Sequence, residues 1–326
     1  MIHDITDHGA VNGTECTLAI RAAIAACRSN GGGEVYVPAG RYIVTKQAGE
    51  SPILTVPSNT MIRGDGAASL LQFPAESNDT DFWRIFGSTG EKNITIRDLA
   101  LAGANTPQRY VAGPTPEHNS GCYFANCENL TLRSLLVTNF SGDGLYVADS
   151  RAVTVRDITL RNFVRHGIQL DGGPTARDYL VTGCRDLEPT VLAGGSTIHA
   201  EHSRGLQNLT VTANHCRRSI VTGDDITGLI VSDNHVTGGI TAIIVRDVII
   251  CGNVVRSPIG LVAIQLQYAH NVMVRDNLIE GDNANQTAIY AVGRTFSQPD
   301  KPCTNIHVSG NVSIGEDTAR LGVRIS

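Results

Sequence analysis

The sequence STIHAEHSRG places two imidazoles and a carboxylate within four positions, at His199, Glu201 and His202. Imidazole and carboxylate groups exchange protons near neutral pH, and both also ligate metal ions. Further carboxylates that could join them are Asp171, Asp224 and Asp225. The local sequence is therefore compatible with an acid–base catalyst, a metal site or one polar face of a strand, and the organisation of the whole chain has to decide.

Composition restricts the classes of partner. The chain has 326 residues and a formal net charge of −5, which argues against nucleic acid or an anionic membrane surface as the main partner. No apolar run reaches the length of about 18 residues that a membrane span needs. The N-terminal segment lacks the basic and apolar regions of a signal peptide, so we expect a cytoplasmic protein or an exported one whose signal has been removed. The eight cysteines stand singly and are predicted to be mostly buried thiols.

A loose repeat organises the chain from about residue 120 onward. The segments GLYVADSRAVTVRDI, GITAIIVRDVIICGN and AIQLQYAHNVMVRDN each contain two alternating strands separated by a turn. Their apolar anchors keep an offset of eight residues, as from Ile240 to Val248 and from Ile264 to Val272. Alternation with a period of two, inside a repeat of about 20–25 residues, is typical of stacked coils of β-strands. One coil cannot bury its apolar side alone, so stacking must create a continuous core.

Asparagine recurs just after the second strand of successive repeats. The positions are Asn214, Asn234, Asn253, Asn277 and Asn311. Because Asn tolerates left-handed backbone and forms hydrogen bonds at turns, we expect these side chains to form a structural ladder from coil to coil.

One amphipathic helix is predicted near the N-terminus by the sequence TLAIRAAIAACRSNGGG. Thr17 is the expected N-cap of this helix and Gly31 its stop signal. The open end of a stack of coils exposes apolar core and unpaired strand edges, so a helix is expected to cover it.

The opening of the chain carries a pattern specific for fold. Its elements are Asp7, Gly9, Ala10, the helix, the glycine run at 31–33 and the strand VYVPAGRY at 35–42. The pattern resembles the pectate-lyase-like superfamily, which includes polygalacturonases, the pectate lyase 3 group and phage tailspike depolymerases. His8 stands where that family has Phe, and NGTECT replaces the usual GDGxTDDT.

The resemblance implies an all-β fold, namely a single-stranded right-handed parallel β-helix with an N-terminal capping α-helix. It agrees with the independent repeat over residues 120–320. We therefore predict one β-helix domain over residues 1–326, with the cap and first strand in 1–45 and the coils over about 50–320.

The motifs of known activity match less well than those of the fold. Polygalacturonases carry Asn-Thr-Asp, Asp-Asp, Gly-His-Gly and Arg-x-Lys on successive coils. This chain has Ser-Gly-Asp-Gly at 141–144, Arg-His-Gly-Ile at 165–168 and Gly-Asp-Asp at 223–225, and it lacks Arg-x-Lys. Asp143 and His166 precede strands, where these residue types are also ordinary at corners. The Asp-Pro-His-Glu pattern of uronate epimerases is absent as well.

The repeat projects the candidate residues onto one surface, because side chains alternate along a strand and those between the apolar anchors point outward. Two registers remain open at 219–226: one exposes Thr222 and Asp224, the other Val221 and Gly223. In the first register, Asp171, Glu201 and Asp224 would stack about 4.8 Å apart on successive coils. We expect these carboxylates, rather than His202, to be the neighbours of Glu201.

A row of carboxylates in a groove favours glycoside hydrolysis, in which two carboxyl groups act as acid and base. The candidate catalytic residues are Asp171, His199, Glu201, Asp224 and Asp225. The candidate substrate-binding residues are Tyr146, Gln169, His202, Arg246, Gln265, Gln267 and Tyr290. The expected partner is an oligo- or polysaccharide, in a groove walled by the insertions at 102–120, 184–197 and 293–305. Association into an oligomer stays open.

Three alternatives compete with hydrolysis. A polysaccharide lyase or uronate epimerase needs Ca²⁺, Lys or Arg to neutralise a substrate carboxylate, and Arg246 or Ca²⁺ held by the acidic cluster could serve. A tailspike-like solenoid would bind glycan without catalysis. A zinc site at His199, Glu201 and His202 lacks a specified further ligand. We therefore expect no cofactor and no metal, with Ca²⁺ as the exception left open.

Overall fold

The alternating segments form short strands, each of which pairs in parallel with the equivalent strand one coil along the chain. The computed structural model describes residues 1–46, 51–74, 83–103, 119–187, 195–257, 262–281, 288–293, 302–314 and 323–325. Its contacts divide the chain into two compact units. The N-terminal unit comprises Met1–Gln169 with Leu187–Gly195, and the C-terminal unit comprises Leu170–Asp186 with Ser196–Ser326. That all coils form one domain stays a prediction.

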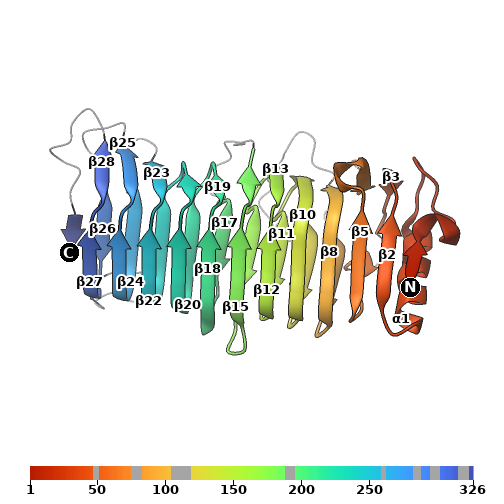
Figure 1. Ribbon diagram of the computed structural model, residues 1–326, viewed down its shortest axis with the longest axis horizontal. Coiled ribbons are helices and arrows are strands. Elements are labelled where there is room, and N and C mark those ends of the chain that lie inside the picture. The colour runs from red at the N-terminus through yellow and green to blue at the C-terminus, as the bar shows by residue number, and fades with distance from the viewer. Residues whose placement is uncertain are drawn as a thin grey trace. The chain divides into compact units, whose positions relative to one another are not determined.

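The N-terminal unit begins with a short strand, a 3₁₀ turn (η1, Ile5–His8) and one helix, and continues as coils (Figure 1). Its strands are β1 (Ile2–Asp4), β2 (Gly33–Val37), β3 (Gly40–Ile43), β4 (Leu54–Thr55), β5 (Thr60–Gly64), β6 (Ser69–Gln72), β7 (Arg84–Thr89), β8 (Lys92–Ala102), β9 (Ser120–Ala125), β10 (Glu128–Phe140), β11 (Leu145–Ala148), β12 (Arg151–Arg156) and β13 (Thr159–Phe163). A second 3₁₀ turn, η2 (Gly66–Ala68), precedes β6, and β14 (Ile168–Asp171) contains the boundary between the units.

The C-terminal unit repeats the coil with less interruption. Its strands are β15 (Arg177–Thr182), β16 (Arg185–Asp186), β17 (Ile198–Glu201), β18 (Leu206–Thr212), β19 (His215–Cys216), β20 (Ile220–Ser232), β21 (His235–Val236), β22 (Ile240–Cys251), β23 (Val254–Ser257), β24 (Ile264–Arg275), β25 (Leu278–Gly281), β26 (Ile289–Val292), β27 (Thr304–Ser309), β28 (Val312–Ile314) and β29 (Val323–Ile325). In Figure 1, β18, β20, β22 and β24 lie side by side as corresponding segments of successive coils.

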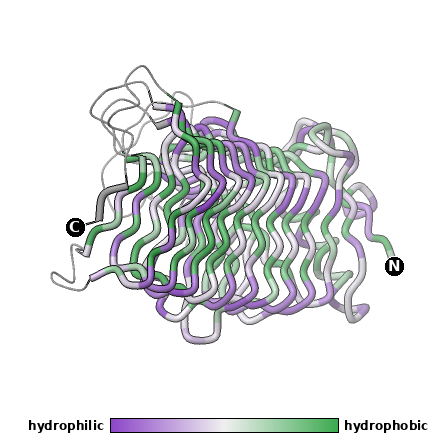
Figure 2. Tube along the Cα trace, turned by 60° about the vertical axis from the view of Figure 1, so that its left-hand side comes forward, coloured by the Kyte–Doolittle hydropathy of each residue, from purple (hydrophilic) through white to green (hydrophobic). Residues whose placement is uncertain are grey.

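Stacks of identical aliphatic residues form the core of the C-terminal unit. The first strand of each coil contributes one isoleucine, and the stack consists of Ile198, Ile220, Ile240, Ile264 and Ile289. The predicted offset is confirmed, because Ile240 pairs with Ile264 and Val248 pairs with Val272, and all four side chains are buried. Figure 2 shows the same alternation as hydrophobic and hydrophilic stretches that recur along each coil. Each fully buried isoleucine contributes about 1.5–3 kcal/mol to folding.

The predicted asparagine ladder is confirmed. Asn214, Asn234, Asn253 and Asn277 are each at most 2% exposed. The side-chain amide of each donates to the side-chain oxygen of the next asparagine at 2.8–2.9 Å, and the ladder ends on Asn311. The same oxygen also accepts the backbone N–H of the preceding asparagine at 3.0 Å. Every turn in this row is therefore hydrogen-bonded to its neighbours without water.

The predicted helix is α1 (Thr17–Ser29), and its buried side chains include Ile20, Ile24 and Cys27. The expected N-cap is wrong by one residue: Cys16 occupies the cap position and makes no side-chain cap bond. The carboxylate of Glu15 accepts the backbone N–H of Thr17 instead, at 3.0 Å. No helix within the described ranges is long and apolar enough to cross a membrane. All eight cysteines are free thiols, and six of them are buried.

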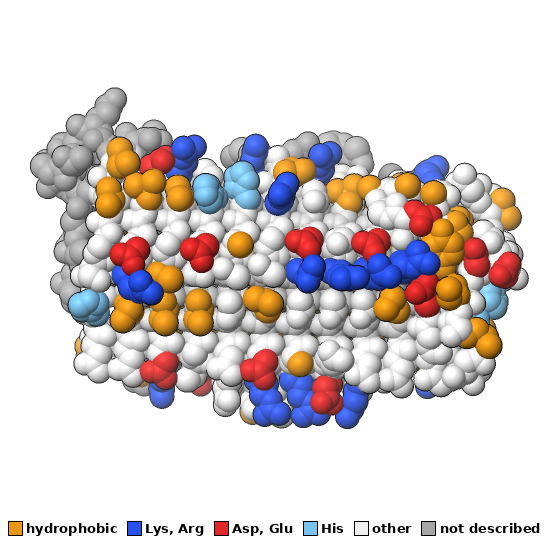
Figure 3. Space-filling view, viewed as in Figure 1, with side chains coloured by type: hydrophobic (Ala, Val, Ile, Leu, Met, Phe, Trp, Pro, Cys, Tyr) orange, Lys and Arg blue, Asp and Glu red, His pale blue; other side chains and the backbone are white. Residues whose placement is uncertain are grey.

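A row of arginines runs across the N-terminal unit. Arg63, Arg97, Arg133 and Arg156 occupy the same register position on β5, β8, β10 and β12. Figure 3 shows Lys and Arg side chains gathered in such a row beside acidic ones. Arg97 and Arg156 each pair with the aspartate that follows them. Arg133 is followed by Ser134 and forms no ion pair with any residue that the structure describes.

Replacement of Asn253 by alanine is expected to lower the free energy of unfolding by roughly 3 kcal/mol, because it leaves buried ladder partners without hydrogen bonds. Urea denaturation measures the change. The control is Asn271→Gly, since Asn271 is exposed, has a left-handed φ of 54° and bonds Asp247 at the surface. This variant should change stability by less than about 1 kcal/mol. Equal effects would contradict the structural importance of the buried ladder.

Candidate functional site

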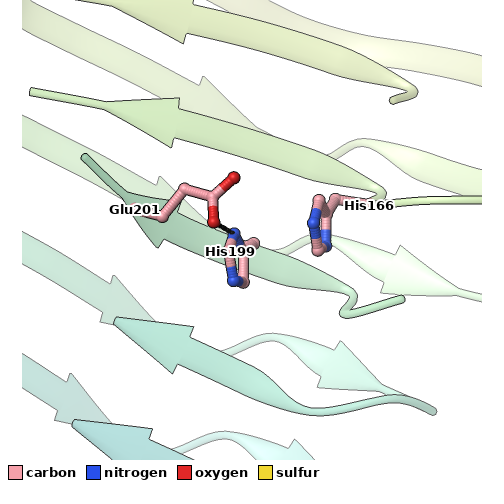
Figure 4. A group of neighbouring side chains, drawn as sticks. All are labelled: His166, His199 and Glu201. Atoms are coloured by element: carbon pink, nitrogen blue, oxygen red, sulfur yellow. Dashed lines mark ion pairs between the residues drawn. The ribbon is translucent and has the colours of Figure 1, made fainter. Parts of the chain in front are cut away.

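His199 and Glu201 lie on the outer face of β17, while Ile198 before them and Ala200 between them are fully buried. The Nδ1 atom of His199 lies 3.9 Å from Oε2 of Glu201, the pair joined by the dashed line in Figure 4. The two side chains keep 13% and 28% of their surface exposed. This arrangement was predicted from the alternation, and it creates a half-buried imidazole–carboxylate pair that can share a proton.

His202 joins this pair, contrary to the expectation from the sequence. On an extended strand His202 would point away from His199, but its backbone is left-handed, with a φ of 51°. Its Nε2 atom consequently lies 4.0 Å from Glu201, and its Nδ1 atom lies 4.0 Å from Asp224. The side chain is 65% exposed. Glu201 is therefore flanked by two imidazoles, one sheltered and one open to solvent.

The predicted row of three carboxylates does not form. Val221 and Gly223 occupy the outward positions of β20, and Thr222 is fully buried between Ala200 and Ala242. A bulge between Gly223 and Ile226 follows, with both aspartates in left-handed backbone at φ values of 64° and 75°. Short polar Asp side chains tolerate this conformation better than most residues. The bulge places Asp224 beside His202, where it also accepts the backbone N–H of His202 at 3.1 Å, while Asp225 is exposed.

The neighbour of Glu201 on the next coil carries no side chain. One coil further, the outward position after Val221 is Gly223, which presents no side chain. A Cβ atom at Gly223 would lie 3.3 Å from that of Ile243, so even alanine would be tight there. Asp171, at the end of β14, is half-buried, and β14 is the neighbour of β17 in the strand order. Asp171 thus remains the candidate carboxylate closest in topology to Glu201.

The other predicted binding residues of the C-terminal unit divide into two groups. Gln265 and Gln267 are half-exposed on the outer face of β24, as predicted, and Tyr290 pairs with Gln265 from β26. Arg246 lies outside this row, because left-handed Ile244 bends the chain before it, and it aligns with Thr227 and His270. Arg246 is therefore not in a position equivalent to Glu201, and its role in binding substrate stays a prediction.

In the N-terminal unit, sequence reasoning was wrong about Gln169 and missed Arg84. The side chain of Gln169 is only 1% exposed and is no open binding group. Tyr146 is half-buried and packs edge-on against Tyr123, with ring centroids 5.1 Å apart. The guanidinium of Arg84 stacks on the Tyr123 ring at 3.6 Å. Arg84 lies at the start of β7, before the sequence repeat that begins near residue 120. The outward-facing residues were predicted from that repeat.

Asp143 and His166 have structural partners in the same unit. Asp143 is fully buried, forms an ion pair of 2.9 Å with Arg165, and accepts the backbone N–H of His166 at 3.1 Å. The corner interpretation therefore accounts for Asp143. His166, also drawn in Figure 4, is 6% exposed. The insertions proposed as groove walls lie mostly outside the described residues, which omit 104–118, 188–194 and 294–301.

Comparison with known proteins supports the fold. No protein-family model matches the chain. Over 111 residues it is 38% identical to the mannuronan C5-epimerase AlgE5 of Azotobacter vinelandii. The matched segment is 32% of this chain and 11% of that enzyme, so the chain corresponds to only a small part of the relative.

Two solved structures match along nearly the whole chain. The A-module of the Azotobacter vinelandii mannuronan C5-epimerase AlgE4 superposes with a TM-score of 0.56, at 18% identity and with 100% of both chains covered. The tailspike of E. coli bacteriophage HK620, solved with a pentasaccharide, superposes with a TM-score of 0.68 at 14% identity. That match covers 96% of this chain and 65% of the tailspike. The fold is a right-handed parallel β-helix, as predicted. At these identities the likeness defines fold and leaves activity to the site.

Two substitutions of Asp225 test whether its left-handed backbone matters for stability. Asp225→Gly should leave the free energy of unfolding unchanged within about 0.5 kcal/mol, because glycine adopts this φ without strain. Asp225→Ala should lower it by about 1 kcal/mol. Urea denaturation of both variants measures this. If alanine and glycine behaved alike, the bulge would not constrain the backbone at Asp225.

Proposed function

We propose that the protein is a carbohydrate-active enzyme that removes a proton next to the carboxylate of an acidic polysaccharide. A proton is then returned, as in a uronate epimerase, or the O4 substituent is expelled, as in a related lyase. The local identity of 38% to a mannuronan C5-epimerase supports this class. The fold match to a second enzyme of that name over its full A-module is consistent with it. The expected partner is thus a polyuronate, bound along the outer face of the coils.

The observation that carries the proposal is the position of Glu201 between two imidazoles, at 3.9 Å from His199 and 4.0 Å from His202. A carbon-bound proton next to a carboxylate is only weakly acidic, so its removal needs a positioned base and a nearby acid. One carboxylate with two imidazoles provides both near neutral pH.

In the proposed mechanism, Glu201 removes the proton from C5 of a uronate residue, and the electron pair moves into the neighbouring carboxylate. His199, whose Nδ1 atom lies 3.9 Å from Oε2 of Glu201, orients this carboxylate and stabilises its charge. The solvent-exposed His202, as imidazolium, returns a proton to C5. Return to the opposite face inverts the carbon, and proton exchange with solvent restores Glu201 and His202. If the O4 substituent departs in place of reprotonation, His202 gives its proton to the leaving oxygen and the product is unsaturated.

Hydrolysis is the second candidate, and one observation favours it. Asp171 and Glu201 end β14 and β17, which are neighbours in the strand order. Two carboxyl groups about 5 Å apart suit a retaining glycosidase. Because Asp224 lies beside His202, the third carboxylate of the predicted row is not in line with Asp171 and Glu201. A glycan-binding solenoid without catalysis is the outcome if no reaction is found.

The proposed reaction moves only protons and one electron pair, so it needs no redox or organic cofactor. Ca²⁺ would be required only if the substrate carboxylate had to be neutralised by a metal at the acidic residues Glu201 and Asp224. Turnover that is unchanged in EDTA is the expected result. A strict requirement for added Ca²⁺ would assign the neutralising role to the metal.

The test offers mannuronan, galacturonan and their neutral counterparts to the protein and follows three readouts. Proton NMR reports inversion at C5, ultraviolet absorbance reports unsaturated products, and a reducing-end assay reports hydrolysis. We expect inversion or absorbance with an acidic polymer. Glu201→Gln should lower turnover by a factor of about 10²–10⁴, the usual contribution of a general acid–base group.

Asp225→Asn is the matched control, because Asp225 is a nearby exposed carboxylate. Among the described residues, it forms no ion pair with His199 or His202. It should retain near-normal turnover. New reducing ends without inversion or absorbance would transfer the assignment to hydrolysis by Asp171 and Glu201. Equal losses in both variants would contradict a specific role for Glu201.

A further inference from the structure

A second polar surface lies in the N-terminal unit, remote in sequence from β17. It is formed by Arg84 on β7, Tyr123 on β9 and Tyr146 on β11. The two tyrosines occupy the same register position on neighbouring coils. All three side chains are half-buried, so each combines packing against the protein with access from solvent.

The backbone makes room for this cluster at one glycine. Gly87 pairs with Tyr123 across β7 and β9, and it has no side chain at the outward position where the other coils have tyrosine. A Cβ atom on Gly87 would lie 2.5 Å from the backbone oxygen of Tyr123. It would also lie 3.1 Å from the Pro52 ring, so the chain is closely packed at this glycine. In the same row, the guanidinium of Arg84 stacks on the Tyr123 ring at 3.6 Å.

This stacking fixes the orientation of the cation. When a guanidinium contacts a ring through its face, its N–H donors point outward from its edge. Two of these donors can then bond one carboxylate. The edge-on contact of Tyr146 with Tyr123 holds the second ring upright beside the first. Tyrosine rings and hydroxyls at a half-open site suit the apolar faces and hydroxyls of a sugar.

The charge around Arg84 is also suited to an anion. Burial lowers the pKa of the Arg84 guanidinium from its usual value, although the nearby Asp143 and both tyrosines oppose this shift. Asp143 is itself matched by Arg165 at 2.9 Å. A carboxylate bound beside Arg84 would meet its guanidinium in a partly desolvated place, where opposite charges attract more strongly than in bulk water.

We propose that Arg84, Tyr123 and Tyr146 form a binding subsite for a carboxylated sugar unit, with Arg84 as the residue that distinguishes acidic from neutral glycans. The proposal rests on the substrate class named under Proposed function but not on catalysis. It assigns the recognition of charge to the N-terminal unit, whereas the proton-transfer groups belong to the C-terminal unit.

The test measures binding by calorimetry with mannuronate oligomers and with mannose oligomers of equal length and linkage, which differ in the carboxylate. Arg84→Gln should weaken mannuronate binding by about tenfold or more and leave mannose binding unchanged. Arg84→Lys, which keeps the charge but loses the paired donors, should weaken it by an intermediate factor. Thermal unfolding and circular dichroism of each variant confirm that it is folded.

Arg133→Gln is the matched control, because it removes one half-buried arginine of the same unit that lies on β10 in the arginine row. It should bind mannuronate like the parent chain. Equal weakening by both variants, equal loss of neutral and acidic ligands, or no mannuronate binding by the parent chain would each overturn the subsite. A sulfated glycan bound as tightly through Arg84 would overturn its selectivity for carboxylate.

The subsite and the enzymatic function fail separately. Binding that depends on Arg84 without any turnover would support the subsite and contradict the epimerase or lyase assignment. If turnover depends on Glu201 but the Arg84→Gln variant binds acidic substrate as well as the parent chain does, the enzymatic function is supported and the subsite is contradicted.

Discussion

In-register hydrogen bonding between parallel coils is the constraint on which the rest of this structure depends. Each strand pairs with its equivalent one coil away, about 4.8 Å distant, so every side chain has a neighbour of fixed identity. Isoleucine consequently stacks on isoleucine in the core, and asparagine donates to asparagine at the turns. Because buried amides without partners are costly, the asparagine ladder favours a single register over a slipped one.

Chemistry arises where this regularity is interrupted. His202 has left-handed backbone just after β17, and Asp224 and Asp225 have it at the bulge within β20. Such positions cost about 1 kcal/mol or more for residues with a side chain, and they are enriched at functional sites. Here the interruptions turn His202 toward Glu201 and remove Asp224 from the carboxylate row. The stacked coils supply rigid positions, and the irregular turns supply the combination of groups.

The two units carry different kinds of polar group on otherwise similar coils. In the C-terminal unit, imidazoles and a carboxylate within about 4 Å of one another suit proton transfer. In the N-terminal unit, a stacked guanidinium with two tyrosines suits recognition of a charged sugar. The same fold is shared by an epimerase module and by a phage tailspike solved with a pentasaccharide. These local groups, and not the coil itself, must therefore distinguish one function from another.

The sequence by itself determined the coil: period-two alternation, the offset between apolar anchors and the recurrent asparagines are local signals, and each predicted the observed stacking. It also determined that His199 and Glu201 face outward, because the alternating apolar residues Ile198 and Ala200 must be buried. The tertiary structure alone decided the register at Val221 and Gly223, the burial of Gln169 and the approach of Arg84 to Tyr123. These features depend on one-residue bulges and on neighbours more than 20 residues away, as with Arg84 and Tyr123, and a shift of one residue exchanges the two faces of a strand.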